Sequence, residues 1–401
     1  MILTHKIALD LNNKQATYCS QAAGTARFAY NWALANWNAQ YQTWQQDNSQ
    51  PKPSEAALRR QLNAIKREQF PWMLKITKNA PQMAIIQLGK AFKNFFAGRA
   101  KYPVFKKKGR SRDSFELSND QFAVDGSSLR IPHLGWVRMR ESLRFSGRII
   151  AATISRTAQK WFVSISVETD ENPHPPKAEN QGVAGVDLGI KTLATIFANG
   201  KFEEKQGSKP LKRYLRKLKK LSRQLSRKVK GSANREKAKI KVAKSHAKIA
   251  NIRQHELHDL TTSLTSRFHT IGIEDLNVKG MMKNHKLSRA IGDMGFFEFR
   301  RQLEYKAQMR GGVVVAADRF FPSSKLCSTP KCGFKLDSLD LSTREWTCPN
   351  CQTCHQRDQN AATNLAYYAV SYTVSACGAD GSGFESQDSK RNHRAEAGIQ
   401  H

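Results

Sequence analysis

Hydrophobic residues recur along the chain with two periods, and these periods divide it into strand-rich and helical stretches. Apolar and polar positions alternate over residues 1–15, which predicts a strand followed by a turn. Over 20–100 the apolar positions instead recur every three or four residues, which predicts helices, and Ser54 is a suitable N-cap for one of them. Alternation returns over 115–168, where we expect strands separated by turns.

The second half of the chain mixes short apolar strands with helices, which indicates a mixed α/β, multidomain protein. The expected elements, in chain order, are a strand and a hairpin over 183–204, a helical pair over 210–268, a strand over 269–276, a helix over 293–310, a buried strand in GGVVVAAD and a short helix in NAATNLAYYAV. Residues 171–182 are rich in Pro and Asn, so we expect a linker there. The segment from Gly378 onwards has no apolar period, and we expect it to be disordered.

The charge of the chain points to a polyanionic partner. Lys and Arg number 66 against 33 Asp and Glu, which gives a formal net charge of +33. Nucleic acid is the first candidate partner, and an anionic membrane surface is the weaker alternative. The stretch 201–255 alone contains 20 Lys and Arg against 3 Glu. No apolar run approaches about 18 residues, so we expect no membrane span.

The cysteines cluster in a pattern typical of a zinc ribbon. Five of the seven lie within 327–354, which favours metal binding in a reducing compartment, so we expect a cytoplasmic protein. Four thiolates in two tight turns would hold one structural Zn²⁺ with no open position. Unligated buried cysteines are the alternative, and Cys354 and His355 are alternative fourth ligands. The expected ligands are Cys327 and Cys332 and, after 15 intervening residues, Cys348 and Cys351.

Three carboxylates stand at positions where strands and a helix could bring them together. Asp187 lies in the apolar strand GVDLG, Glu274 ends the strand IGIEDL, and Asp358 begins a helix in HQRDQNAA. Each alone could be a surface residue, and Asp358 could be a helix N-cap. Acids that converge from strand ends can hold Mg²⁺ ions that activate water and stabilise the leaving oxygen of a phosphodiester. The order of the surrounding elements matches the RNase H-like fold of nucleases and polynucleotidyl transferases, so we expect a catalytic triad.

Taken together, these motifs resemble those of the TnpB family, the RuvC-type, RNA-guided nucleases of insertion sequences, to which the compact type V CRISPR nucleases are also similar. The matching stretches extend from residue 1 to about 370 and are ARFAYNWAL, AFKNFF, YPVFKKK, IPHLGWVRM, GVDLGIKTLAT, IGIEDLNVKGM, QLEYKA, the cysteine pairs and HQRDQNAATN. Two features depart from the family. The first cysteine pair is C-x4-C rather than C-x2-C, and Gln352 stands where a Gly commonly follows the last cysteine.

The resemblance implies a wedge-type β-barrel interrupted by a helical recognition insert, followed by a RuvC-like nuclease domain that is interrupted by a zinc ribbon. On this sequence the implied segments are 1–18 and 101–180 for the wedge barrel, 19–100 for the recognition insert, 181–321 and 355–375 for the nuclease with a basic helical insert at 205–268, 322–354 for the zinc ribbon, and 376–401 for a disordered tail.

The resemblance also implies the chemistry and the partners. Asp187, Glu274 and Asp358 fall on the family's three catalytic acids, which bind two Mg²⁺ ions, and the four cysteines fall on its zinc ligands. The implied partners are a guide RNA from the element's own end and double-stranded target DNA, which is cut beside a short flanking motif. No membrane is involved. The implied setting is the prokaryotic cytoplasm, in association with the nucleoid.

A further implied site would read the DNA motif that flanks the target. The segment ITKNAPQ at 76–82 resembles the helix start that reads this motif in the family. Lys78 and Gln82 are its candidate readers, with Ser118 and Asn119 as further candidates from the β region. The alternative for each of them is an ordinary polar surface residue.

Two other functions remain open. A DNA transposase would use the same acids without RNA, and an RNA-guided repressor would have lost one of the acids.

The aromatic residues of the first helical stretch could stack on bases, but their helical spacing favours packing in a core. They are Phe28, Tyr30, Trp32 and Trp37.

Overall fold

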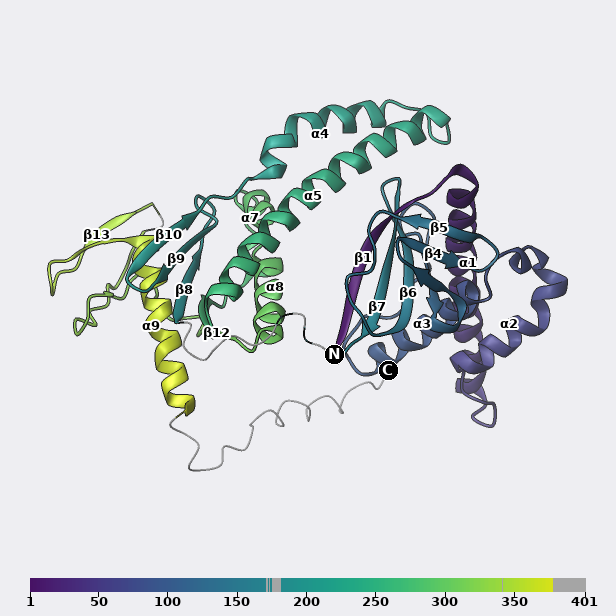
Figure 1. The fold of residues 1–401 in the computed structure, drawn as a ribbon, viewed down its shortest axis with the longest axis horizontal. Coiled ribbons are helices and arrows are strands. Elements are labelled where there is room, and N and C mark those ends of the chain that lie inside the picture. The colour runs from purple at the N-terminus through teal and green to yellow at the C-terminus, as the bar shows by residue number, and fades with distance from the viewer. Residues whose placement is uncertain (171, 173, 175–181, 341, 378–401) are drawn as a thin grey trace. The chain divides into compact units, whose positions relative to one another are not determined.

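The described residues form two compact units (Figure 1). The computed structural model describes residues 1–170, 172, 174, 182–340 and 342–377. Unit 1 comprises Met1–Pro173 with Leu221–Ala247, and unit 2 comprises His174–Lys220 with the chain from Lys248 onwards. Most of the predicted linker at 171–182 and all of the predicted disordered segment from Gly378 lie outside the described residues. No helix in the described ranges is long and apolar enough to cross a membrane.

Unit 1 is built on a seven-stranded antiparallel sheet (Figure 1). Its strands are β1 (Ile2–Asp10), β2 (Ser114–Ser118), β3 (Ala123–Asp125), β4 (Ser128–Ile131), β5 (Gly135–Met139), β6 (Arg148–Thr157) and β7 (Lys160–Glu168), in the spatial order β2-β6-β7-β1-β5-β4-β3. β1 pairs with β7 from Ile2 opposite Glu168 to Leu9 opposite Trp161. The N-terminal strand therefore lies inside a sheet whose other strands come from 114–168.

The helices of unit 1 precede most of its strands. Apart from the helical residues within 221–247, they are α1 (Asn13–Gln46), α2 (Glu55–Gln69) and α3 (Asn79–Phe96), with two short 3-10 turns, η1 (Pro71–Lys75) and η2 (Asn119–Gln121). α1 begins earlier than predicted because Asn12 and Gln15 form a capping box, in which each side chain accepts a hydrogen bond from the other's backbone N–H, at 2.9 and 3.0 Å. Ser54 caps α2 as predicted, through the N–H of Ala57 at 3.2 Å.

The sheet of unit 1 is open, which corrects the prediction of a closed β-barrel. In the described part of the chain, the end strands β2 and β3 pair with β6 and β4 respectively, and not with each other. Alternating apolar and polar residues identify strands, but they do not reveal closure, because a barrel also requires its two end strands to pair. Here α3 and α1 pack against β2 instead.

The aromatic residues of α1 belong to the core of unit 1. Tyr30 and Trp37 are buried, and Phe28 and Trp32 pack against the same hydrophobic cluster while partly exposed. The ring of Trp37 stacks on that of Phe92 from α3, with centroids 4.2 Å apart. This arrangement confirms core packing as their main role.

Unit 2 contains a five-stranded mixed sheet in the order β10-β9-β8-β11-β12. The elements from 183 onwards are β8 (Val183–Leu188), β9 (Ala194–Ala198), β10 (Lys201–Lys205), α4 (Pro210–Ser226), α5 (Ala233–Arg267), β11 (Thr270–Glu274), α6 (Val278–Met281), α7 (Ser288–Met294), α8 (Phe296–Met309), β12 (Val313–Ala317), β13 (Glu345–Thr347), β14 (Cys354–Gln356) and α9 (Arg357–Cys377). β8, β11 and β12 are parallel, and β9 and β10 form an antiparallel hairpin. The predicted strands and the helical pair α4–α5 are confirmed.

Two helices of unit 2 differ from the prediction. The helix expected over 293–310 is interrupted at Gly295, whose φ of 74° ends α7 in the left-handed conformation that glycine adopts easily. The last helix is longer than NAATNLAYYAV, because α9 already starts at Arg357 and continues to Cys377. Asp358 therefore lies within the first turn of a long helix.

α9 lies against β8 and β11 at two glycines. A Cβ atom on Gly185 would overlap the carbonyl oxygen of Ala362, and a Cβ atom on Gly272 would overlap that of Leu365. Only a residue without a side chain allows the helix backbone to come this close to the strands. Gly185 stands two residues before Asp187, and Gly272 stands two residues before Glu274. The close contact of α9 with these two glycines therefore also fixes the distance from α9 to the ends of β8 and β11.

We expect Gly185→Ala to destabilise unit 2 by about 1–3 kcal/mol or more, because the overlap is with helix backbone, which cannot rotate away. Gly292→Ala in α7 is the matched control, since its Cβ would lie no closer than 3.6 Å to the nearest atom, in Met282. Thermal unfolding of the two variants tests this. Equal unfolding temperatures would show that α9 does not need the close approach.

Candidate active site and metal centre

One cleft in unit 2 brings the three predicted acids together. Asp187 lies near the end of β8, Glu274 is the last residue of β11, and Asp358 is in the first turn of α9. β8 and β11 are parallel neighbours, so their carboxyl ends meet at the same edge of the sheet. All three carboxylates line a cleft of about 760 Å³. Apolar side chains from 276–296 form another part of its wall.

The acids in the cleft interact electrostatically. Burial, followed by the negative charges of Glu274 and Asp358, raises the pKa of Asp187 well above its usual range. The positive charge of Arg357 acts in the opposite direction but does not cancel this effect. A cation between the carboxylates would stabilise their ionised forms, so the cleft is electrostatically suited to bind one.

Neighbouring side chains orient two of the acids. The hydroxyl of Ser323 donates a hydrogen bond to Oε1 of Glu274. A guanidinium nitrogen of Arg344 lies 3.5 Å from Oδ1 of Asp358. Arg344 and Arg357 both line the cleft, so positive charge stands beside the acids. Sequence reasoning did not identify these three residues. Ser323 and Arg344 lie in stretches with neither an apolar period nor a quoted motif, and Arg357 lies in the motif HQRDQNAATN, but only the folded chain shows that it lines the cleft.

The second predicted centre is a compact cysteine cluster near β13 and β14. The sulfur atoms of the four predicted ligands all lie within 4.8 Å of one another. His355 places Nε2 3.0 Å from the sulfur of Cys327, and Cys354 is exposed and outside the cluster. The cluster is thus formed by the four cysteines themselves, and His355 contacts it from outside. The residues of the cluster are Cys327, Cys332, Cys348 and Cys351.

Local turns explain how an atypical sequence forms this cluster. Gln352 has a φ of 58°, and its N–H donates to the carbonyl oxygen of Cys348 at 2.9 Å. It therefore adopts the left-handed conformation that glycine usually supplies at such a turn. In the longer first pair, the N–H of Cys332 donates to the carbonyl oxygen of Thr329 at 3.1 Å, so the two additional residues are accommodated within a turn.

The chemistry of the cysteine cluster fits a metal. Hydrogen bonds from Thr353 lower the pKa of Cys351 to about 5, whereas burial raises the pKa of Cys327 to about 12. A bound metal would stabilise the thiolate form of both. Within the described ranges, the four cysteines are a group of possible metal ligands whose donor atoms all lie within 4.8 Å of one another. The three carboxylates instead line a cleft of about 760 Å³.

Comparison with known proteins identifies the family. Family models match three parts of the chain: a "Probable transposase" model (OrfB_IS605) over 163–285, a "Cas12f1-like, TNB domain" model over 296–365 and a "Helix-turn-helix domain" model over 1–46. A Streptomyces pristinaespiralis protein is 37% identical over 372 residues, covering 91% of this chain and 88% of its own. The chain belongs to the TnpB family.

A second relative agrees with this assignment to TnpB. The InsQ protein of Escherichia coli (strain K12) is 33% identical over 390 residues, covering 93% of each chain. Both relatives bear the name "Putative RNA-guided DNA endonuclease". The solved cryo-EM structure of CasPhi-2 (Cas12j) bound to crRNA aligns with a TM-score of 0.43 at 10% identity, covering 92% of this chain and 98% of that one.

The candidate flank-reading residues of this TnpB protein lie at the start of α3 and the end of β2, in unit 1. Lys78, Gln82 and Asn119 are exposed, and Ser118 is partly buried. Asn79 joins the two elements, since its Nδ2 donates to the hydroxyl of Ser118 at 2.6 Å.

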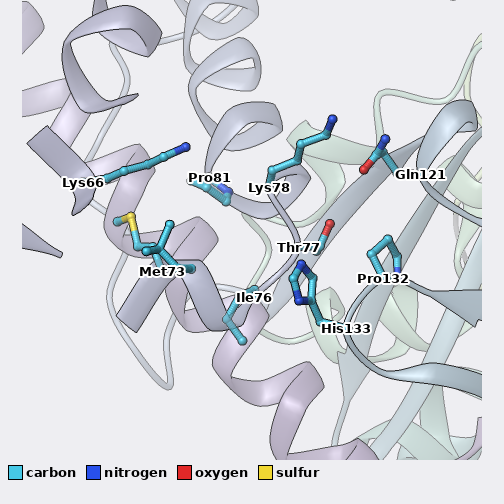
Figure 2. A pocket seen from close by; sticks show the side chains of 10 residues that line it. Lys66, Met73, Ile76, Thr77, Lys78, Pro81, Gln121, Pro132 and His133 are labelled. Carbon is cyan, nitrogen blue, oxygen red and sulfur yellow. The ribbon is translucent and has the colours of Figure 1, made fainter. Parts of the chain in front are cut away.

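Of these four candidates, only Lys78 lines a nearby cavity of about 340 Å³ (Figure 2). Lys66 from α2, Gln121 from η2 and His133 from the turn between β4 and β5 also line it. Sequence reasoning missed these three residues. His133 lies in the quoted motif IPHLGWVRM and has a φ of 63°, but only the folded chain brings it next to Lys78.

We expect Cys348→Ser to remove most of the bound zinc and to lower the unfolding temperature, because folding of such modules is coupled to metal binding. Cys348 is fully buried in the cluster. Cys354→Ser is the matched control and should retain about one zinc per chain, since Cys354 is exposed outside the cluster. Elemental analysis after purification without chelator provides the measurement. Wild-type protein without zinc would contradict the expectation.

Proposed function

We propose that this protein is an RNA-guided DNA endonuclease of a transposable element. It cuts DNA complementary to a guide RNA, beside a short flanking motif, by hydrolysis of a phosphodiester. Asp187, Glu274 and Asp358 are its catalytic acids. The main support is that three carboxylates from separate elements line one cleft in a chain of the TnpB family. The names of its relatives support the same function.

The donor atoms of the cleft suit magnesium. Carboxylate oxygens are the hard ligands that Mg²⁺ prefers, so the three acids would hold it, as a pair of ions. Bound there, Mg²⁺ would activate water and stabilise the leaving oxygen of the phosphodiester. Burial and the negative charges of Glu274 and Asp358 raise the pKa of Asp187, and a bound cation would relieve this repulsion between the carboxylates. Arg344 and Arg357 add positive charge beside the acids, where it can attract the phosphate of the DNA strand.

The four clustered cysteines would hold one structural Zn²⁺. Their compact arrangement supports a closed site, which has no position for a substrate. Because β14 ends at Gln356 and α9 begins at the next residue, Arg357, the fold of the cysteine module restricts the position of the first turn of α9. Zinc thereby supports the helix on which Asp358 lies, without taking part in the reaction.

The domain organisation implied by the family is part of this proposal. The wedge corresponds to 1–18 and 101–180, with a recognition insert at 19–100. The RuvC-like nuclease corresponds to 181–321 and 355–375, with the zinc ribbon at 322–354. The helices between β1 and β2, and the acids on β8, β11 and the start of α9, support this division.

Charge and base pairing have different tasks in this proposal. The net charge of +33, with its concentration over 201–255, favours guide RNA and target DNA through phosphate contacts. Such contacts weaken as salt concentration rises and do not depend on sequence. The choice of target then comes from pairing between guide and DNA, and the protein itself reads only the flank.

A DNA transposase that acts without RNA is the second candidate function. It is favoured by the "Probable transposase" family model over 163–285, and it would use the same acids. An RNA-guided repressor is disfavoured, because the chain retains all three carboxylates.

We expect protein purified without its RNA to cut no defined duplex site in the presence of Mg²⁺. Adding RNA with a new guide segment should redirect cleavage to the complementary DNA, provided that the correct flank is present, because base pairing selects the target. Sequencing the cleaved ends for two unrelated guides gives the measurement. Strand cleavage and joining at element ends by RNA-free protein would favour the transposase.

Asp187→Ala is the matched control for this experiment. It removes a proposed metal ligand from the cleft and leaves the basic surfaces unchanged, so cleavage should be lost while RNA and DNA binding stay near the wild-type level. Full cleavage by a contaminant-free Asp187→Ala protein would refute the role of the acids.

We also propose that Lys78 and Gln82 read the flank, with Ser118 and Asn119 as additional contacts. Substituting Lys78 or Gln82 by Ala should change the accepted flank, by about 1–3 kcal/mol of discrimination per lost base contact, more than it changes RNA affinity. Lys75→Ala is the matched control, since Lys75 is exposed nearby but does not line the cavity. Cleavage of a library of randomised flanks measures the effect. An unchanged preference in the Lys78 and Gln82 variants would exclude them as readers.

A further inference from the structure

A buried hydrogen-bond network connects Glu274 to α9, and the proposed reaction does not account for it. Its first member is Ser323, in the loop that follows β12. Ser323 is only 3% exposed, and its hydroxyl donates to Oε1 of Glu274. Among the described residues this is the one side-chain hydrogen bond to the Glu274 carboxylate, so its second oxygen is available to a cation in the cleft.

Two asparagines of α9 fix the backbone around Ser323. Nδ2 of Asn364 donates to the carbonyl oxygens of Ser323 and Leu326, both at 2.7 Å. Nδ2 of Asn360 donates to the carbonyl oxygen of Leu326 at 2.7 Å, and its Oδ1 accepts from the N–H of Ser328 at 3.0 Å. The loop is therefore attached to α9 on both sides of Cys327.

The burial of this network makes its geometry specific. Asn360 and Asn364 are 2% and 3% exposed, so any of their polar atoms that lost its partner would have no water to replace it. They stand one helical turn apart, on the helix that also contains Asp358. The loop, the two asparagines and two of the three acids thus form one connected structure.

We propose that Ser323 is a positioning residue for Glu274, and that Asn360 and Asn364 determine the position of Ser323. The inference rests on the proposed nuclease function, in which Glu274 binds Mg²⁺. The terminal torsion of a Glu side chain has a broad energy minimum, so an unsupported carboxylate can rotate. A hydrogen bond to one oxygen restricts that rotation, and outer-shell partners of this kind strongly affect how well a ligand holds its metal.

The test is the Mg²⁺ dependence of guided cleavage by Ser323→Ala and Ser323→Thr. Ser323→Ala should need roughly 10-fold or more Mg²⁺ for half-maximal cleavage, the lower end of the effect of losing an outer-shell partner. Ser323→Thr keeps the hydroxyl and should restore most of the wild-type dependence. Affinity for RNA and target DNA should not change, because no phosphate-binding charge is altered.

Thr363→Ala is the matched control. Thr363 is also a buried hydroxyl, on α9 itself, but it donates within the helix to the carbonyl oxygen of Gln359 at 2.9 Å. Its loss should leave the Mg²⁺ requirement unchanged. An equal rise in both alanine variants would mean that general loosening of the region is responsible, which would overturn the positioning role of Ser323.

A double-mutant cycle tests the second part of the proposal. Asn364→Ala alone should raise the Mg²⁺ requirement, and in a Ser323→Ala background it should add little, because both changes would act through the same hydrogen bond to Glu274. Additive effects would overturn the assigned path from Asn364 through Ser323. Zinc content and unfolding temperature are measured in parallel, and a Ser323→Ala protein that has lost zinc or its fold would also overturn the positioning role.

The outcomes distinguish this inference from the proposed function. Wild-type cleavage that is lost in Asp187→Ala, together with an unchanged Mg²⁺ requirement in Ser323→Ala, would refute the inference alone. Cleavage that persists in Asp187→Ala would refute the proposed active site, whatever Ser323→Ala does.

Discussion

The close contact of α9 with β8 and β11 is the constraint on which the arrangement of unit 2 depends. It exists because Gly185 and Gly272 present no side chain to the backbone of α9. Since an acid follows each glycine after two residues, the contact that packs the helix also sets where Asp358 stands relative to Asp187 and Glu274. Packing and site geometry are therefore determined by the same few atoms.

Electrostatics divides the molecule into surfaces that favour anions and a cleft that favours cations. The chain has twice as many basic as acidic side chains, yet three of its acids share one cleft, where burial raises the pKa of Asp187. Basic surfaces can hold the phosphates of nucleic acid, and the acid cleft gathers the negative charge that a divalent cation compensates. A protein that hydrolyses phosphodiesters with bound Mg²⁺ needs both.

The two proposed metal centres differ in how open they are, as a structural site and a catalytic site require. Four sulfur atoms within 4.8 Å of one another form a compact site, whereas the carboxylates line an open cleft of about 760 Å³. The loop 318–328 contacts both centres. Ser323 in this loop donates a hydrogen bond to Glu274, and Leu326 and Ser328, on either side of Cys327, are hydrogen-bonded to Asn360 and Asn364. A change in the position of this loop would therefore affect both centres.

Apolar periods, the spacing of the cysteines and the order of the elements predicted most strands and helices, the four cysteines that cluster and the three acids that line the cleft, because these signals can be read along the chain without its tertiary contacts. The sequence by itself did not determine that the sheet of unit 1 is open, since closure depends on which distant strands pair. It also missed the break at Gly295, the early start of α1 and the contribution of Ser323, Asn360 and Asn364. These features depend on single caps or on partners up to 49 residues away, which only the tertiary structure brings into hydrogen-bonding distance.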